Sequence, residues 1–312
     1  MPDLITSNKN EIIKQSNVLT TAAYSLAKNE KRLVYLALNA IHKGEAKQNE
    51  LGSFPVEIHH SDYSELYTIK MDTACRDIRN AAKSLNQKEV IFYLPDEDLD
   101  DEKALDAISW TVKRSHRPKR GVTVLHFNAE LLHVIKNVDN NFTRLLKGDI
   151  SKLEKPCSMR LYDSMMQWAV KGEVTFSIEW MINRYELPIK YLERMSDFRR
   201  RFLKPAVDEI NEKTSINVSY EEIKGKGKRA KPSSIKFEIT SRLLPEKIIN
   251  NTASTLEDAV KTYCELNDQI CLPSKKEIEN LERFISELVL EGFDMGLDFG
   301  QKLKAAKAAL IE

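Results

Sequence analysis

Apolar residues recur at helical spacing through much of the first half of the chain, and in shorter runs they alternate with polar residues. The helical pattern predicts helices over residues 19–27, 29–44, 61–67 and 71–85. Asn29 is a suitable N-cap for the second of these helices, and Gly44 is a suitable end. The alternating pattern predicts strands over residues 54–58, 89–94 and 121–127.

The second half of the chain repeats this order of elements. The predicted elements are helix 156–169, strand 174–177, helix 178–185, an arginine-rich helix reaching residue 212, and strands 216–220 and 234–239. Val56 and Val174 in the first strands are 118 residues apart, and Asp77 and Asp197 in the second helices are 120 apart. A matched order at a nearly constant offset is typical of a duplicated module. Each unit follows the plan of a winged helix, a helix-turn-helix completed by a β-hairpin wing.

The predicted fold class is therefore α+β and mainly helical, with two tandem winged-helix domains and a C-terminal helical extension. We expect the domains at residues 1–148, of which 1–15 are flexible, and at 149–245, with the extension at 246–312. The extension contains 13 acidic and 8 basic residues, so it carries a net charge of −5 while the first 245 residues carry +6. This asymmetry indicates that only the basic body meets an anionic partner.

Residues 194–203 contain four arginines interleaved with large apolar residues. On a wheel at about 100° per residue, one face is apolar: Met195, Phe198, Phe202, Leu203, Ala206 and Ile210. The opposite face is polar: Arg194, Asp197, Arg200, Arg201 and Lys204. The planar fork of arginine matches guanine O6 and N7, and aspartate accepts from cytosine N4 or holds an arginine in place. This face is predicted to bind DNA; a solvated amphipathic helix is the alternative.

Arg199 falls among the apolar positions of the same wheel. We expect its stem to pack inward and its guanidinium to pair with an acid or a carbonyl. The preceding helix is predicted to stop at Glu186-Leu187-Pro188, which leaves a tight turn before the arginine helix.

The equivalent helix of the first half divides in the same way. Its inward stripe consists of Ala74, Cys75, Ile78, Ala81, Ala82 and Leu85. Its outward stripe consists of Arg76, Arg79, Asn80 and Lys83, and asparagine offers a donor and acceptor pair that fits adenine. A second major-groove helix is the functional interpretation, and surface solvation is the alternative.

Two basic runs are predicted to be wing-tip loops, residues 113–120 and 224–231. Lys226, Lys228 and Arg229 in the second run suit phosphate neutralisation, which adds affinity without sequence information. Solvated loops without a partner are the alternative.

The remaining composition favours a reduced, soluble, non-catalytic protein. The net charge is +1, and the four cysteines are scattered, without a CxxC pair or a nearby histidine. We therefore expect no metal site, no cofactor, no enzyme activity and a cytoplasmic location. No apolar run reaches membrane-spanning length, and the N-terminus lacks an apolar signal core.

The chain resembles the iteron-binding plasmid replication initiators. The shared stretches include Ala22-Ala23-Tyr24-Ser25-Leu26, Asp77-Ile78-Arg79 and Met159-Arg160-Leu161-Tyr162. The most specific is Arg194-Met195 followed by Asp197-Phe198-Arg199-Arg200-Arg201-Phe202-Leu203. The resemblance covers residues 15–240, so it carries nothing over to the extension.

The resemblance implies two winged-helix domains with pseudo-twofold symmetry that place one helix each in the major groove. It implies double-stranded DNA as partner: a monomer on origin direct repeats, and a homodimer on an operator inverted repeat that represses the initiator's own promoter. It also implies contacts with a host initiator, helicase and chaperones. Arg114 aligns with a position implicated in the dimer-to-monomer balance. Cys75-Arg76 departs from the family pattern, which puts base preference of the first helix in doubt.

Two other classes fit some of these signals. A winged-helix transcriptional repressor without initiator activity has the same sequence pattern. A nicking replication enzyme requires two histidines on one face near a nucleophilic tyrosine, and adjacent His59 and His60 point to opposite faces of a strand.

Overall fold

The computed structural model describes residues 11–44, 49, 53–94, 104–136, 142–169, 171–225 and 231–241. All of these residues belong to one compact unit, Met1–Ser241. The predicted helical extension, Cys264 and Cys271, and the predicted phosphate contacts Lys226, Lys228 and Arg229 lie outside the described residues.

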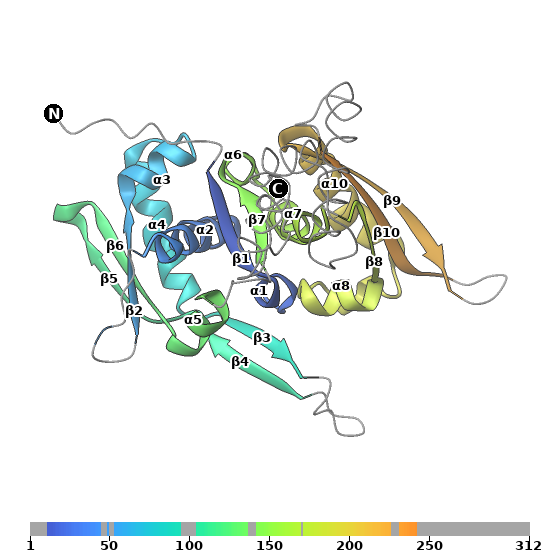
Figure 1. The fold of residues 1–312 in the computed structure, drawn as a ribbon, viewed down its shortest axis with the longest axis horizontal. Helices are drawn as coiled ribbons and strands as arrows, with labels where there is room; N and C mark the ends of the chain where they lie inside the picture. The colour runs from blue at the N-terminus through green and yellow to red at the C-terminus, as the bar shows by residue number, and fades with distance from the viewer. Residues whose placement is uncertain are drawn as a thin grey trace, which may run out of the picture. The chain divides into compact units, whose positions relative to one another are not determined.

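The first half contains a helix-turn-helix framed by a three-stranded sheet (Figure 1). Its helices are α1 (Asn17–Thr21), α2 (Lys28–His42), α3 (His60–Leu66), α4 (Met71–Leu85), α5 (Ala129–Lys136) and α6 (Lys147–Ile150). Its strands are β1 (Ile12–Ser16), β2 (Phe54–His59), β3 (Glu89–Tyr93), β4 (Leu105–Ser109), β5 (Thr111–Arg117), β6 (Val122–Phe127) and β7 (Phe142–Leu146).

The second half contains the same arrangement. Its helices are α7 (Pro156–Trp168), α8 (Ile178–Arg184), α9 (Met195–Phe198) and α10 (Lys204–Lys213), with a 3₁₀ turn η3 (Ile189–Tyr191) and a π-helical turn η4 (Arg199–Leu203). Its strands are β8 (Glu173–Ser177), β9 (Ile216–Lys224) and β10 (Pro232–Ser241), and Figure 1 shows β9 and β10 as a long hairpin.

The two three-stranded sheets have the same topology. The strand orders are β2-β6-β5 and β8-β10-β9, all antiparallel, so in each case the first strand pairs with the last one. The chain is thus α+β with two winged-helix modules, as the pattern predicts. The remaining strands form two separate pairs, β1 with β7 and β3 with β4.

The hydrophobic core is built from the stripes that the periodicity indicates. In the first module Ala74, Ile78 and Leu85 of α4 are buried. In the second, the apolar residues of the arginine helix are buried as well: Phe198, Phe202, Leu203, Ala206 and Ile210 are at most 2% exposed, Val207 is 6% exposed and Met195 is 8% exposed. Each buried Ile, Leu or Phe side chain contributes about 1.5–3 kcal/mol when it leaves water, so these stripes hold the second helix of each module against its neighbours.

Three predicted elements of the first half are wrong. The helix predicted over residues 19–27 ends at Thr21, because the backbone is already extended at Ala22. Residues 113–120 are not a wing-tip loop, because β5 extends to Arg117 and pairs with β6; only the 3₁₀ turn Pro118–Arg120 and Gly121, with φ 63°, form the turn. Residues 11–15 are not flexible, because β1 pairs with β7, with Ile12 opposite Leu146. Local periodicity cannot show pairing between strands so far apart in the sequence.

The arginine helix also differs from the regular helix that the wheel assumes. Its middle turn, η4, is π-helical, and α10 follows it with Lys204 as its first residue and Pro205 as its second. Proline has no N–H to donate and its ring clashes with the carbonyl four residues earlier, that of Arg201. A wider turn at this point accommodates both effects without ending the helix.

Candidate nucleic-acid interface

The arginine helix of the second module follows a helix that is firmly capped. The Ser177 hydroxyl accepts a hydrogen bond from the Trp180 N–H at 3.0 Å, which starts α8 at Ile178. Between Arg184 and Met195 lie ten residues, including η3, so the predicted tight turn is longer than expected. Phe198 and Phe202 stack with their ring centroids 5.5 Å apart and anchor the inner face of the helix.

The outer face brings together the cations that the wheel places there. Arg200, Arg201 and Lys204 are exposed, and Arg194 is exposed at the N-cap of α9 rather than inside the helix. Asp197 lies beneath two of these side chains: its Oδ1 is 2.9 Å from Arg200 and 3.4 Å from Arg201. The hydrogen bond from Arg200, with the charges of Arg201 and Arg194, holds the pKa of Asp197 below its usual value. Asp197 therefore holds arginines in place, one of the two roles predicted for it.

Arg199 forms a separate ion pair. Its Nε and Nη2 donate to the two carboxylate oxygens of Glu222 on β9, at 2.5 and 2.7 Å. This pairing with an acid is the expected one, although the Arg199 side chain remains 43% exposed and does not pack inward. The ion pair raises the pKa of Arg199 and lowers that of Glu222.

The corresponding helix of the first module is α4. Its outward residues are exposed, as predicted: Arg76, Arg79, Asn80 and Lys83. Cys75, which the pattern assigns to the core, is only half-buried. Arg76 lies 3.8 Å from Asp77, and Arg79 donates toward His116 on β5. Arg114 is exposed on β5, opposite Leu125 of β6.

Comparison with protein families identifies both modules. A family described as "Initiator Replication protein, WH1" matches residues 12–166, and one described as "Initiator Rep protein, WH2" matches residues 177–239. The chain belongs to the family of replication initiator proteins with two winged-helix domains.

Two further similarities agree with membership of this initiator family. An "Uncharacterized 27.6 kDa protein" of Escherichia coli is 30% identical over 219 residues, which is 68% of this chain and 90% of that protein. The crystal structure of Pi initiator protein in complex with iteron DNA has a TM-score of 0.58 at 22% identity and covers 75% of this chain and 98% of that one. At this identity the second similarity shows a shared fold.

Sequence reasoning missed the residue that joins the two modules of this initiator. Arg160 of α7 is buried, with 6% of its surface exposed. Its guanidinium donates to three carbonyls: those of Thr20, Ala22 and Arg184. The guanidinium carbon also lies 3.9 Å from the ring centroid of Tyr24. The resemblance includes Arg160, but only the three-dimensional arrangement reveals these acceptors from α1 and α8.

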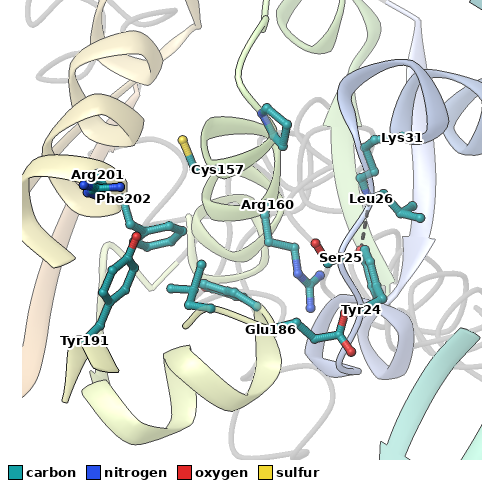
Figure 2. A pocket seen from close by; sticks show the side chains of 13 residues that line it. Tyr24, Ser25, Leu26, Lys31, Cys157, Arg160, Glu186, Tyr191, Arg201 and Phe202 are labelled. Atoms are coloured by element: carbon teal, nitrogen blue, oxygen red, sulfur yellow. Dashed lines mark hydrogen bonds between the residues drawn. The ribbon is translucent and has the colours of Figure 1, made fainter. Parts of the chain in front are cut away.

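A cavity of about 300 Å³ adjoins this junction (Figure 2). Tyr24 and Arg160 line one side, and Tyr191, Arg201 and Phe202 line the other. The cavity therefore connects the junction between modules to the arginine helix.

The described residues contain neither a candidate metal site nor a candidate membrane span. Within that part of the chain, no three His, Cys, Asp or Glu side chains are grouped closely enough to hold a metal ion. No helix in the same part is both long and apolar enough to cross a membrane.

Proposed function

We propose that this protein is a plasmid replication initiator that binds origin direct repeats through two recognition helices, α4 and the helix formed by α9, η4 and α10. Family membership and the shared fold with an initiator that was crystallised on iteron DNA support this proposal. The observation that carries it is the exposed basic face on the second helix of both modules. If these helices were only solvated surface, there would be no reason for both modules to have a basic face on the same helix.

Base reading is assigned to arginines on these faces. Arg200 and Arg201 from the second module, and Arg76 and Arg79 from the first, reach guanine O6 and N7, while Asn80 suits adenine. Asp197 orients Arg200 and Arg201 before DNA arrives, which reduces the side-chain entropy lost on binding.

Affinity without sequence preference is assigned to the lysines and to the wing. Lys83, Lys204, Arg194 and the wing residues Lys226, Lys228 and Arg229 neutralise phosphates and release counterions. Binding is therefore expected to weaken steeply as salt concentration rises.

The two modules are proposed to be related by a pseudo-twofold axis, so that their helices enter successive major grooves about one turn apart. By resemblance, a monomer binds each origin repeat, and a homodimer binds an operator inverted repeat and represses the initiator's own promoter. Arg114 is proposed to influence the balance between the two states. The protein is proposed to act in the cytoplasm without a catalytic step or cofactor and to recruit a host initiator and helicase. By resemblance, host chaperones help to convert the dimer to the monomer.

Footprinting on the DNA beside the gene tests this function. Protection of several direct repeats, together with plasmid maintenance by the gene and those repeats alone, is the expected result. Protection of one inverted repeat without plasmid maintenance would instead identify a transcriptional repressor. No protection at any repeat would contradict both functions.

A further inference from the structure

The strand register reveals which residues of the two modules are equivalent. In the first module Thr123 of β6 pairs with Ile58 on one side and His116 on the other. In the second, Ile235 of β10 pairs with Phe176 and with Glu222. Ile58 and Phe176 are 118 residues apart, the same offset that relates Val56 to Val174. His116 and Glu222 therefore occupy one and the same wing position.

The arginines that these two wing residues contact are equivalent as well. His116 Nε2 lies 3.2 Å from Arg79 Nη2, and Glu222 binds Arg199. Arg79 and Arg199 are 120 residues apart, the offset that also relates Asp77 to Asp197. Each recognition helix thus has one arginine held by the same position of its own wing, by a neutral imidazole in the first module and by a carboxylate in the second.

A chain of polar contacts continues behind His116. His116 Nδ1 and His60 Nε2 each lie 3.0 Å from the Thr123 hydroxyl, and His60 Nδ1 lies 3.2 Å from Cys75 Sγ. The two imidazole rings stack with centroids 5.6 Å apart. Since a guanidinium only donates, His116 Nε2 must accept from Arg79, and its Nδ1–H is then the donor to Thr123. The contacts therefore fix one tautomer of His116.

The second module shows that the fold does not need this chain. By the same offsets, His60, Thr123 and Cys75 correspond to Ile178, Ile235 and Met195, all of which are buried apolar residues. In the second module, apolar side chains therefore fill these three positions, so the fold itself does not require polar residues there. A buried histidine and threonine in their place indicate a role in orienting His116.

We propose that His116 is a positioning residue for DNA recognition: its neutral ring holds Arg79 in the orientation in which α4 reads a base, and protonation of the ring releases that hold. This inference rests on the proposed function. Arg199 gives its Nε and Nη2 to a carboxylate on its wing, whereas Arg79 contacts the neutral His116 through Nη2, which leaves its other N–H donors for guanine.

The surroundings of His116 favour the neutral ring. The groups that face it are Arg79 from α4, His60 from α3 and Thr123 from β6, and Cys75 of α4 contacts the far nitrogen of His60. Burial, and then the charge of Arg79, lower the pKa of His116. Burial, His116, Arg79 and His59 lower the pKa of His60. A proton on His116 would remove the acceptor and place a positive charge against the guanidinium.

The test uses the full-length protein and a duplex that it selects from a random-sequence pool, with a scrambled duplex of equal length as reference. The ratio of the two affinities is measured by fluorescence anisotropy from about pH 5.5 to 8, where histidine changes charge. We expect the ratio to fall as pH drops through the lowered pKa of His116. The expected fall is about two- to tenfold, because this is the change in affinity that the loss of one hydrogen bond causes. His116→Gln, which keeps an acceptor but does not titrate, should retain the neutral-pH ratio and lose the pH dependence.

Two further variants separate positioning from a general structural role. His116→Leu should lower the ratio at every pH, and adding it to Arg79→Ala should change nothing more. Circular dichroism checks folding; if His116→Leu does not fold, the comparison of His116→Gln with the parent protein decides. An unchanged pH dependence in His116→Gln, or a further loss in the double variant, would overturn the inference. Failure to select any duplex would instead contradict the proposed function.

Discussion

Thr68 and Glu186 occupy the same position in two copies of one turn, 118 residues apart, and both have a positive φ, 52° and 47°. In each turn the N–H of the next residue, Ile69 or Leu187, donates to the carbonyl five residues earlier, at 3.0 and 2.9 Å. A left-handed residue that ends the first helix lets the chain reverse toward the recognition helix. The duplication thus extends to individual backbone angles.

Because of the positive φ in this turn, substitution by glycine is expected to stabilise the protein. Because left-handed backbone costs a residue with a side chain about 1–2 kcal/mol, Thr68→Gly should raise the free energy of unfolding by about 0.5–1 kcal/mol after the entropy of the unfolded chain is included. Glu186→Gly should act in the same direction but less, because Thr68 is β-branched. Urea unfolding measures both. Ser84→Gly within α4 is the control and should destabilise; the same sign for Thr68→Gly would contradict the account.

Arg199 and Arg200 are neighbours with different predicted roles. Arg199→Ala removes the ion pair with Glu222 and should lower the free energy of unfolding by about 1 kcal/mol, a modest amount because the side chain is 43% exposed. Arg200→Ala should leave stability within about 0.5 kcal/mol and lower specific DNA affinity by about 1–3 kcal/mol. Urea unfolding and anisotropy on the selected duplex measure the two effects. Equal effects of both variants on DNA affinity would refute the distinction.

Because Lys31 and Asp163 form a buried ion pair, substitutions of the two residues are expected to have non-additive effects on the free energy of unfolding. Lys31 Nζ lies 2.6 Å from Asp163 Oδ2, and both side chains are almost fully buried. Lys31→Met leaves a buried carboxylate without its cation, so it should destabilise by about 3–5 kcal/mol. The double variant Lys31→Met, Asp163→Leu should be more stable than Lys31→Met alone. Additive losses in a double-mutant cycle would show that the pair itself contributes little.

The surroundings of Glu209 predict that the folded protein loses stability in acid. Burial alone would raise its pKa, but hydrogen bonds that include Lys213 and the N–H groups of Glu154 and Lys155 outweigh burial and lower it. A lowered folded-state pKa gives stability that is present above the unfolded pKa and is lost as pH falls through the folded value. Glu209→Gln should therefore destabilise at neutral pH, with a difference from the parent that shrinks below about pH 4.5. A constant difference at all pH values would contradict this assignment.

Local patterns were sufficient for much of the fold. The prediction of α4 over residues 71–85 is confirmed, because its apolar stripe and its outward cations have helical spacing and its environment is regular. The sequence also indicated the exposed faces of both recognition helices, since the opposite stripes are strongly apolar.

What the sequence did not show depends on distant partners. The pairing of β1 with β7 and the hydrogen bonds from Arg160 to Thr20 and Ala22 join segments more than 100 residues apart. The π-helical turn arises from one proline inside an otherwise good helix, which the wheel treats as a regular position. The polar chain behind His116 was missed because its members come from α3, α4, β5 and β6, and the run that contains His116 was interpreted as a loop.

Two recognition helices acting on one site are the central claim, and dimethyl sulfate protection of guanine N7 on the selected duplex tests it most directly. The account predicts protected guanines in two major-groove segments about 10 base pairs apart. Arg79→Ala should abolish protection in one segment and Arg200→Ala in the other, while the remaining segment stays protected. A single protected segment, or loss of the same guanines in both variants, would contradict the account.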